Sequence, residues 1–157
     1  MKHGLTVSIR HADLADAERI VKWRNLPEIV RLSQSQRLIA LEEHLKWFSE
    51  ALASPNHCIL VIVANGEEVG LIRFEKESAC CTATIYLVPG HEGRGIGSSA
   101  FRLALAEAER TLSCRFFEAH IREENQASIR FFEKFGFSQA RSRQGMEIYQ
   151  YGKKESV

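Results

Sequence analysis

The chain has 157 residues, of which 45% are hydrophobic and 26% are charged, and this composition is typical of one folded domain with a buried core. A net charge of +1 gives no overall attraction for nucleic acid or for an anionic membrane surface, so we expect neither partner. The chain shows neither the apolar run of a signal peptide nor a stretch of membrane-spanning length, which predicts a cytoplasmic protein.

The first third of the chain predicts one strand and two helices. Apolar and polar residues alternate over 5–10, which is the pattern of a half-buried strand. Apolar residues then recur at helical spacing over 13–24, where Asp13 is a suitable helix cap. Residues 30–39 are polar and irregular, and a second amphipathic helix is expected from about 41 to 54. A polar loop between two rigid helices is a common place for recognition residues.

The remainder of the chain predicts a three-stranded meander, a helix, a strand, a second helix and a final strand pair. Asn65-Gly66 is a typical hairpin turn between the first two strands of the meander. The expected elements are strands at 57–64, 68–75 and 80–88, a helix at 95–110, a strand at 115–121, a helix at 125–135, and strands at 137–141 and 147–151.

Glycines at 93, 95 and 97 stand where the third strand of the meander turns into a helix. The unpaired amides at a helix N-terminus and the helix dipole favour an anion such as pyrophosphate there, although such a turn also serves simply for close packing. The stretch lacks the lysine of a Walker loop, and no acidic residue closes a following strand as in a dinucleotide fold. A different nucleotide is therefore expected.

The four cysteines, Cys58, Cys80, Cys81 and Cys114, lie in apolar, strand-like surroundings without the spacing of zinc or redox motifs. We expect four buried, reduced thiols and no metal.

Two motifs carry a resemblance to a known family. The stretch EGRGIG at 92–97 is similar to a (Gln or Arg)-x-x-Gly-x-(Gly or Ala) pyrophosphate loop, and NQASIRFFEKFGF at 125–137 is similar to an Asn-x-x-(Ala or Ser) helix that ends in an apolar residue, Gly and Phe. With the order of the predicted elements, the whole chain resembles the GNAT superfamily of acyl-CoA-dependent N-acetyltransferases.

The resemblance implies an α/β (α+β) fold in which residues 1–157 form a single domain. It has a mixed sheet of about seven strands, about four helices and a splayed parallel strand pair at the CoA site. The implied co-substrate is acetyl-CoA, with no metal. The residues implied to bind it are Leu87, Val88, Glu92, Gly93, Arg94, Gly95, Ile96, Gly97, Ser98, Asn125, Ser128 and Phe132.

Two of these positions depart from the family pattern. Glu92 stands where Gln or Arg is usual, which leaves the backbone amides and Arg94 to bind phosphate. Phe132 stands where many members have a tyrosine that protonates the CoA thiolate, so that role does not carry over. A thiol with a pKa of about 8.5 leaves tolerably as the thiolate.

Acetyl transfer to an amine needs a base, because a primary amine is mostly protonated at neutral pH. Glu118 and His120 share one face of a predicted strand, and His120 is the first candidate because imidazole titrates near neutral pH. A purely structural histidine at a strand end is the other reading. Tyr86, Thr84 and Glu75 are substitutes, and backbone amides at 86–88 are expected to stabilise the oxyanion.

The acceptor is expected to be a small molecule with a primary amine. The stretches at 23–28 and 41–48 resemble the branch that acetylates nucleotide-linked amino sugars and, to a lesser degree, the branch that acts on the amino termini of ribosomal proteins. Arginines before Leu41 suit sugar-nucleotide phosphates. The expected substrate-binding residues are Trp23, Arg24, Asn25 and Arg31. A non-catalytic acyl-CoA sensor is the alternative of another class, and either a monomer or a homodimer is expected.

Overall fold

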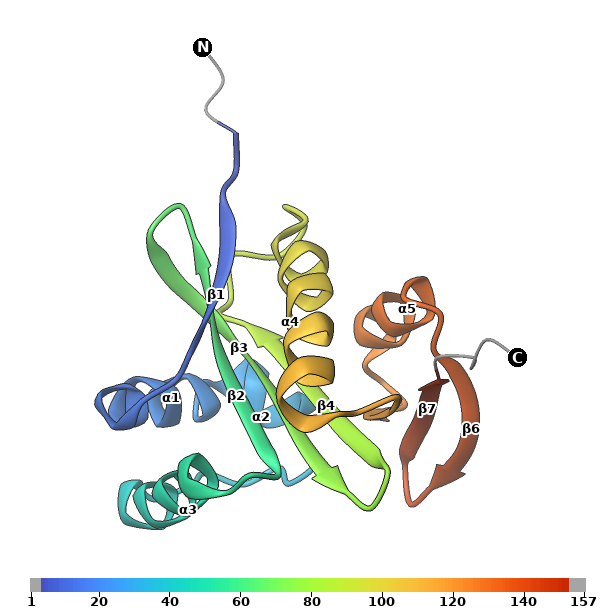
Figure 1. Ribbon diagram of the computed structural model, residues 1–157, viewed down its shortest axis with the longest axis horizontal. Coiled ribbons are helices and arrows are strands. Elements are labelled where there is room, and N and C mark those ends of the chain that lie inside the picture. Colours follow the sequence, from blue (N-terminus) through green and yellow to red (C-terminus); the bar gives the residue numbers. More distant parts are fainter. Residues whose placement is uncertain (1–3, 153–157) are drawn as a thin grey trace.

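The computed structural model describes residues 4–152, and one seven-stranded sheet in the order β1-β2-β3-β4-β5-β7-β6 forms its centre (Figure 1). Every neighbouring pair of strands is antiparallel except β4 and β5, which are parallel. The strands are β1 (Val7–His11), β2 (His57–Ala64), β3 (Glu67–Glu77), β4 (Cys80–Leu87), β5 (Phe116–Arg122), β6 (Ser138–Arg143) and β7 (Met146–Gly152). The expected mixed sheet with one parallel pair is confirmed.

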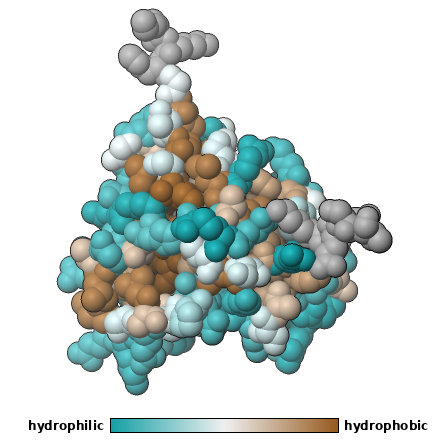
Figure 2. Space-filling view, viewed as in Figure 1, coloured by the Kyte–Doolittle hydropathy of each residue, from teal (hydrophilic) through white to brown (hydrophobic). Residues whose placement is uncertain are grey.

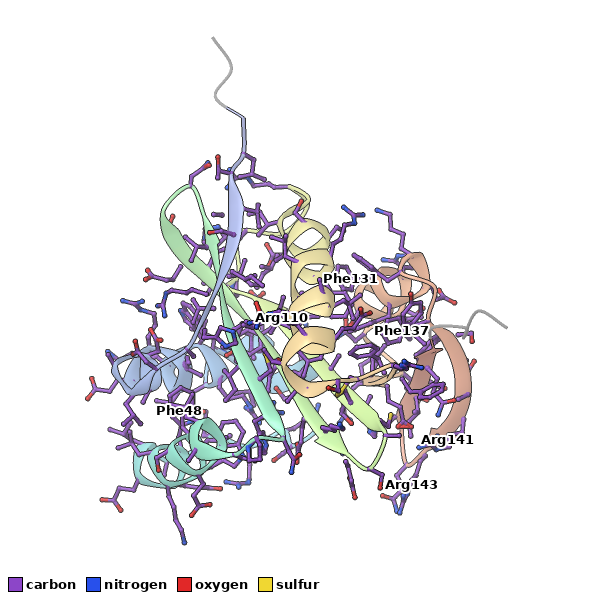
Figure 3. All side chains as sticks on the ribbon, viewed as in Figure 1. Phe48, Arg110, Phe131, Phe137, Arg141 and Arg143 are labelled. Carbon is purple, nitrogen blue, oxygen red and sulfur yellow. A yellow bond between two sulfur atoms is a disulfide. The ribbon has the colours of Figure 1, made fainter. Side chains whose placement is uncertain are left out.

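Helices cover both faces of the sheet, as Figure 1 shows. One cluster of buried side chains joins the sheet to α4 and α5, and a second joins the opposite face to α1 and α3. In Figure 3, Phe48 lies among the helices α1 and α3, whereas Phe131 and Phe137 lie on the side of α4 and α5. The helices are α1 (Ala17–Arg24), α2 (Pro27–Leu32), α3 (Leu41–Ala53), α4 (Ile96–Leu112) and α5 (Gln126–Lys134).

The helix expected over 13–24 is divided, and a further helix follows it. A short 3-10 turn, η1 (Leu14–Asp16), carries the Asp13 cap, and α1 continues from it. Residues expected to leave the helical state at Pro27 instead form α2, where Pro27 occupies the first turn. Proline is well tolerated there because the first amides of a helix have no intrahelical acceptor.

The alternating residues of each strand point to different layers. In β5, Phe117, Ala119 and Ile121 are buried on the α4 and α5 side, so Glu118 and His120 face the side of α1–α3. β2 has an almost continuous apolar run because helices cover both of its faces. Figure 2 shows hydrophobic residues gathered where Figure 1 places α1 and α3.

The parallel pair opens after three residues. β4 and β5 are in register only at Cys80–Phe116, Cys81–Phe117 and Thr82–Glu118, and beyond these positions the two strands diverge. The rest of β4 remains paired with β3, and all of β5 remains paired with β7. The facing edges are therefore left without a strand partner, which is the splay expected from the sequence.

The expectation of four reduced thiols is wrong for one pair of cysteines. Cys81 on β4 and Cys114, which follows α4, form a disulfide with their Cα atoms 6.2 Å apart. Cys58 and Cys80 are free, as expected, but Cys80 is only half-buried. Sequence spacing did not indicate the pair, because 33 residues separate the two cysteines and only the crossover through α4 brings them together.

Candidate active site

A cavity of about 1100 Å³ opens where β4 and β5 diverge. Its glycine-loop half is formed by the turn at 89–95 and by the first residues of α4 and α5. Its helical half is formed by α1, α2, the segment 33–39, the start of α3, and the face of β3 and β4 that carries Arg73 and Tyr86. The cavity thus passes through the sheet edge and joins the two helical layers.

The residues expected to bind CoA are largely brought together in the glycine-loop half. Val88 and Arg94 do not line the cavity within the described chain. Those that do are Leu87, Glu92, Gly93, Gly95, Ile96, Gly97, Ser98, Asn125, Ser128 and Phe132.

The backbone at the start of α4 presents unpaired donors to this half. Gly95 is the N-cap and has φ +79°, a left-handed conformation that favours glycine. The Ser99 amide is the first to donate to the helix, at 3.1 Å from the Gly95 carbonyl oxygen. The three preceding amides, at 96–98, have no intrahelical acceptor and lie at the positive end of the helix dipole. Gly97, unlike Gly93 and Gly95, lies inside the helix and does not have a positive φ.

The Glu92 side chain forms a hydrogen bond within the turn that precedes α4. Its Oε2 accepts a hydrogen bond from the Gly90 amide at 2.8 Å. A carboxylate in place of the usual Gln or Arg therefore has a local partner, and Gly90 itself has φ +100°. The carboxylate also places a negative charge beside the candidate anion site. The backbone amides must therefore attract a phosphate more strongly than this charge repels it.

Asn125 caps α5. Its Oδ1 accepts from the Ser128 amide at 3.2 Å, while its Nδ2 has no partner among the described residues. The side chain is thus both a helix cap and a free donor at the cavity wall. Phe132 is 2% exposed and packs edge-on against Phe101, with ring centroids 5.4 Å apart, so it contributes an apolar wall and no proton.

His120 lines the cavity, but Glu118 does not. The His120 Nε2 is buried without a hydrogen-bond partner and lies 3.6 Å from the Glu118 Oε2. Glu118 accepts hydrogen bonds from Arg141 at 3.0 Å and from Gln150 at 3.1 Å. Burial raises the pKa of Glu118, but these hydrogen bonds outweigh burial and hold the pKa below its ordinary value. Glu118 is therefore an anion beside the imidazole and a weaker base than an ordinary carboxylate.

The substitutes for His120 are less suited to act as a base. Burial raises the pKa of Tyr86, so its hydroxyl stays neutral and is able to donate a hydrogen bond rather than accept a proton from an amine. Thr84 lines the cavity, and Glu75 is exposed and lies outside it. Of the three, only the Tyr86 hydroxyl is buried and without a partner.

The helical half uses several expected substrate residues for its own structure. The Arg24 guanidinium donates to the Ser35 carbonyl at 2.7 Å and to the Arg37 carbonyl at 3.3 Å. Asn25 exchanges two hydrogen bonds of 2.8 Å with the Ile39 backbone. These contacts shape the segment 33–39 over the cavity. Arg24 lines the cavity, but Asn25 does not.

The other two expected substrate residues also lie outside the cavity lining. Trp23 packs against the core between α1, α3 and the sheet, and Arg31 is exposed on α2. Conversely, Arg73, His44 and Trp47 line the cavity. His44 and Trp47 lie in the stretch 41–48 that the sequence associated with the acceptor, but none of the three was among the expected substrate-binding residues. An arginine inside the apolar stretch Leu71-Ile72-Arg73-Phe74 was the available signal for Arg73.

Within the described residues, no helix combines the length and apolarity that a membrane crossing needs. The described part of the chain also contains no group of three or more His, Cys, Asp or Glu side chains placed to hold a metal ion.

Comparison with known proteins identifies the fold and the family. A domain from Methanocaldococcus jannaschii is 24% identical with a TM-score of 0.84, over 95% of this chain and 99% of that one. A putative acetyltransferase from Salmonella typhimurium with acetyl-CoA is 24% identical with a TM-score of 0.78, over 97% and 96%. Spermidine N-acetyltransferase from Vibrio cholerae, in complex with CoA and spermine, is 15% identical with a TM-score of 0.78, over 92% of each chain.

No curated protein sequence gives a significant match. Residues 6–138, however, match the acetyltransferase (GNAT) domain family. That match covers most of the sequence, including the glycine turn, His120 and α5. The chain therefore belongs to the GNAT family and is an acetyl-CoA-dependent N-acetyltransferase.

Proposed function

We propose that the protein transfers the acetyl group of acetyl-CoA to the primary amine of a small, phosphate-bearing acceptor of the nucleotide-linked amino sugar type, with His120 as the base. One observation carries this proposal. His120, whose Nε2 has no hydrogen-bond partner, lines the same cavity as the glycine turn. A proton acceptor and an anion site thus open onto one space between the splayed strands.

The glycine-loop half fits the nucleotide end of CoA. The amides at 96–98 provide donors for a pyrophosphate, and the helix dipole favours its charge. The Asn125 Nδ2 provides a further donor, and the unpaired edges of β4 and β5 offer backbone groups to an extended amide-containing arm. Arg94, exposed outside the cavity lining, remains a candidate for an outer phosphate.

In the reaction, the amine nitrogen forms a bond to the acetyl carbon, and the bond from that carbon to sulfur breaks. His120 takes the proton that the nitrogen loses, and the anionic Glu118 favours the resulting imidazolium. The thiolate leaves without a dedicated acid, because Phe132 has no proton to give and a thiol pKa of about 8.5 makes this tolerable.

The helical half supports an anionic acceptor more than a polycation. Arg24 and Arg73 line it, and the charge of both acts on Tyr86. Spermine, which the Vibrio cholerae enzyme binds, carries several positive charges that these arginines would repel. Arg31 and Arg37 support the proposal less than the sequence indicated, since the first is outside the cavity and the second is paired with Glu43 at 2.5 Å.

A screen for thiol release from acetyl-CoA tests the proposal, with amino sugar nucleotides, simple amino sugars, polyamines and amino-terminal peptides as acceptors. Turnover with an amino sugar nucleotide is expected. A response to peptides alone would assign the protein to amino-terminal acetylation. Binding of acetyl-CoA without turnover on any amine would favour a non-catalytic sensor.

A further inference from the structure

Arg73 forms no ion pair among the described residues, although the charge of the exposed Glu75, two residues along β3, acts on it from a greater distance. Arg73 lies on β3, half-buried at the cavity wall, with its guanidinium 5.0 Å from the centre of the Trp47 ring. Among the described residues, no hydrogen-bond acceptor or carboxylate lies within bonding distance of it. Contact with the face of a tryptophan stabilises a cation but satisfies none of its five N–H donors.

Tyr86 lies beside Arg73 on the same face of the sheet. β3 and β4 pair Arg73 with Thr84 and Leu71 with Tyr86, so the arginine and the tyrosine are diagonal neighbours across the two strands. The Tyr86 hydroxyl is buried and has no hydrogen-bond partner. The charges of Arg73 and Arg24 oppose the effect of burial on the Tyr86 pKa, which is consistent with their proximity.

The acidic residues of the cavity do not neutralise this corner. Glu92 accepts from the Gly90 amide in the turn, and Glu43 is paired with Arg37. Glu28 lies in the first turn of α2 and is exposed. Arg24 already gives its guanidinium to two backbone carbonyls. Arg73 and Tyr86 therefore both line the cavity with donors that have no acceptor among the described residues.

A buried donor without an acceptor is costly, as at the Tyr86 hydroxyl. An arginine presents its donors as a planar fork that matches a carboxylate or a phosphate. We propose that Arg73 and Tyr86 form a subsite that binds an oxyanion of the acceptor, a carboxylate or phosphate group, on the helical side of the site. This inference rests on the proposed function, and it adds that a negative charge on the acceptor is recognised directly by these two side chains.

The kinetic test uses matched acceptors that differ only in charge: an amino sugar phosphate against the same amino sugar, and an amino acid against its amide. In the wild type, the anionic member of at least one pair should have the higher kcat/KM. Arg73→Met should lower kcat/KM for that member by about 10-fold to 100-fold, chiefly through KM, and change the neutral member little. The pair that responds shows whether the oxyanion is a phosphate or a carboxylate.

Matched variants separate the subsite from general effects of charge and folding. Arg143→Gln removes an exposed arginine on β6, which Figure 3 places at the far end of the hairpin, and it should leave both members unchanged. Arg73→Lys and Tyr86→Phe should each give a partial loss on the anionic member alone. They keep the test decisive if Arg73→Met does not fold. Equal losses on both members would overturn the subsite.

A binding test needs no turnover. The protein is saturated with CoA, so that the glycine turn is filled, and its melting temperature is measured with inorganic pyrophosphate or with succinate. At least one probe should raise the melting temperature of the wild type and of Arg143→Gln, but not of Arg73→Met or Arg73→Lys/Tyr86→Phe. An equal rise in all variants, or no rise in any, would overturn the subsite. Failure of every amine in the kinetic test, with CoA still bound, would instead overturn the proposed function.

Discussion

His120 and Glu118 stand two residues apart on β5, but their surroundings give them different roles. His120 lines the cavity and its buried Nε2 has no hydrogen-bond partner, whereas Glu118 is held by Arg141 and Gln150 and lies outside the cavity lining. A base must reach the reacting amine, and of these two side chains only His120 lines the cavity. In the proposed mechanism Glu118 is a positioning residue, because from 3.6 Å it can orient the imidazole and stabilise its charged form.

We predict that His120→Ala lowers kcat by about 10²-fold to 10⁴-fold, because the amine loses its base. The acidic limb of the rate profile should disappear as well, since a histidine base is inactive when it is protonated. Initial rates of thiol release, measured across the pH range, give both kcat and the acidic limb. Glu118→Gln should lower kcat less and keep the limb. If His120→Ala retains both the wild-type kcat and the acidic limb of the pH–rate profile, His120 has a structural role and is not the base.

Asp16 carries a separate prediction about stability. Its carboxylate is buried, pairs with the Arg10 guanidinium at 2.7 and 2.8 Å and accepts from the Asp13 amide at 2.9 Å. The hydrogen bonds from Arg10 lower the pKa of Asp16 below its ordinary value of 3.8, and the Asp13 amide contributes to this against the opposing effect of burial.

We predict that Asp16→Asn lowers the free energy of unfolding by about 1–3 kcal/mol at neutral pH, because Arg10 loses its charged partner. Since the folded pKa is the lower one, the stabilisation is present above about 3.8 and is lost as the pH falls through the folded pKa. Urea unfolding at about pH 7 and about pH 3 measures the difference. If the difference in the free energy of unfolding between wild type and Asp16→Asn is as large in acid as at neutral pH, the charged Asp16–Arg10 pair is not its source.

At the level of elements, periodicity gave most of the architecture because each strand and helix has one buried side. β5 is the clear case, where alternation alone placed Glu118 and His120 on a common face. The α2 helix was missed because Pro27 is a breaker inside a helix and a favourable residue at its start, and sequence position does not distinguish the two. The disulfide was missed because no local pattern encodes a contact made through the α4 crossover.

The site was predictable where backbone geometry defines it and unpredictable where tertiary contacts do. The glycine turn has a sequence signature, so the anion site could be located from residues 92–98. Arg24 and Asn25 were expected to bind substrate, but their partners are the backbone of 33–39, which has no periodic pattern to place it. Arg73 had a sequence signal in its apolar surroundings, but its place on the cavity wall beside Trp47 and Tyr86 is visible only in three dimensions.

The start of α4 carries a prediction with an internal control. Gly95 and Gly145 both have φ +79°, and a Cβ on either would meet nothing within 4 Å. Each substitution by alanine should therefore lower stability by the same amount, about 1–2 kcal/mol. Only Gly95 adjoins the amides at 96–98, so only Gly95→Ala should weaken acetyl-CoA binding, by about tenfold or more, as measured by calorimetry. Equal affinities in the two variants would remove the helix N-terminus from the CoA site.

For the whole molecule, the notable feature is how few backbone contacts join the two parts of the sheet. β1–β4 form one continuous antiparallel block, β5–β7 form another, and three residue pairs connect them. The Cys81–Cys114 disulfide and the packing of α4 add to this connection. The cavity lies at the seam, so a ligand there contacts both blocks at once.

We therefore predict that acetyl-CoA holds the two blocks together. At a hundredfold excess over Kd it should raise the melting temperature by roughly 5–10 °C. Hydrogen exchange should slow at 83–88 and 119–122, the diverging edges of β4 and β5, and at 96–98, because these backbone groups gain a partner. β1 and β6, which lie at the outer edges of the sheet, serve as internal references and should change little. Protection that is uniform across the chain would mean that acetyl-CoA stabilises the fold without bridging the seam.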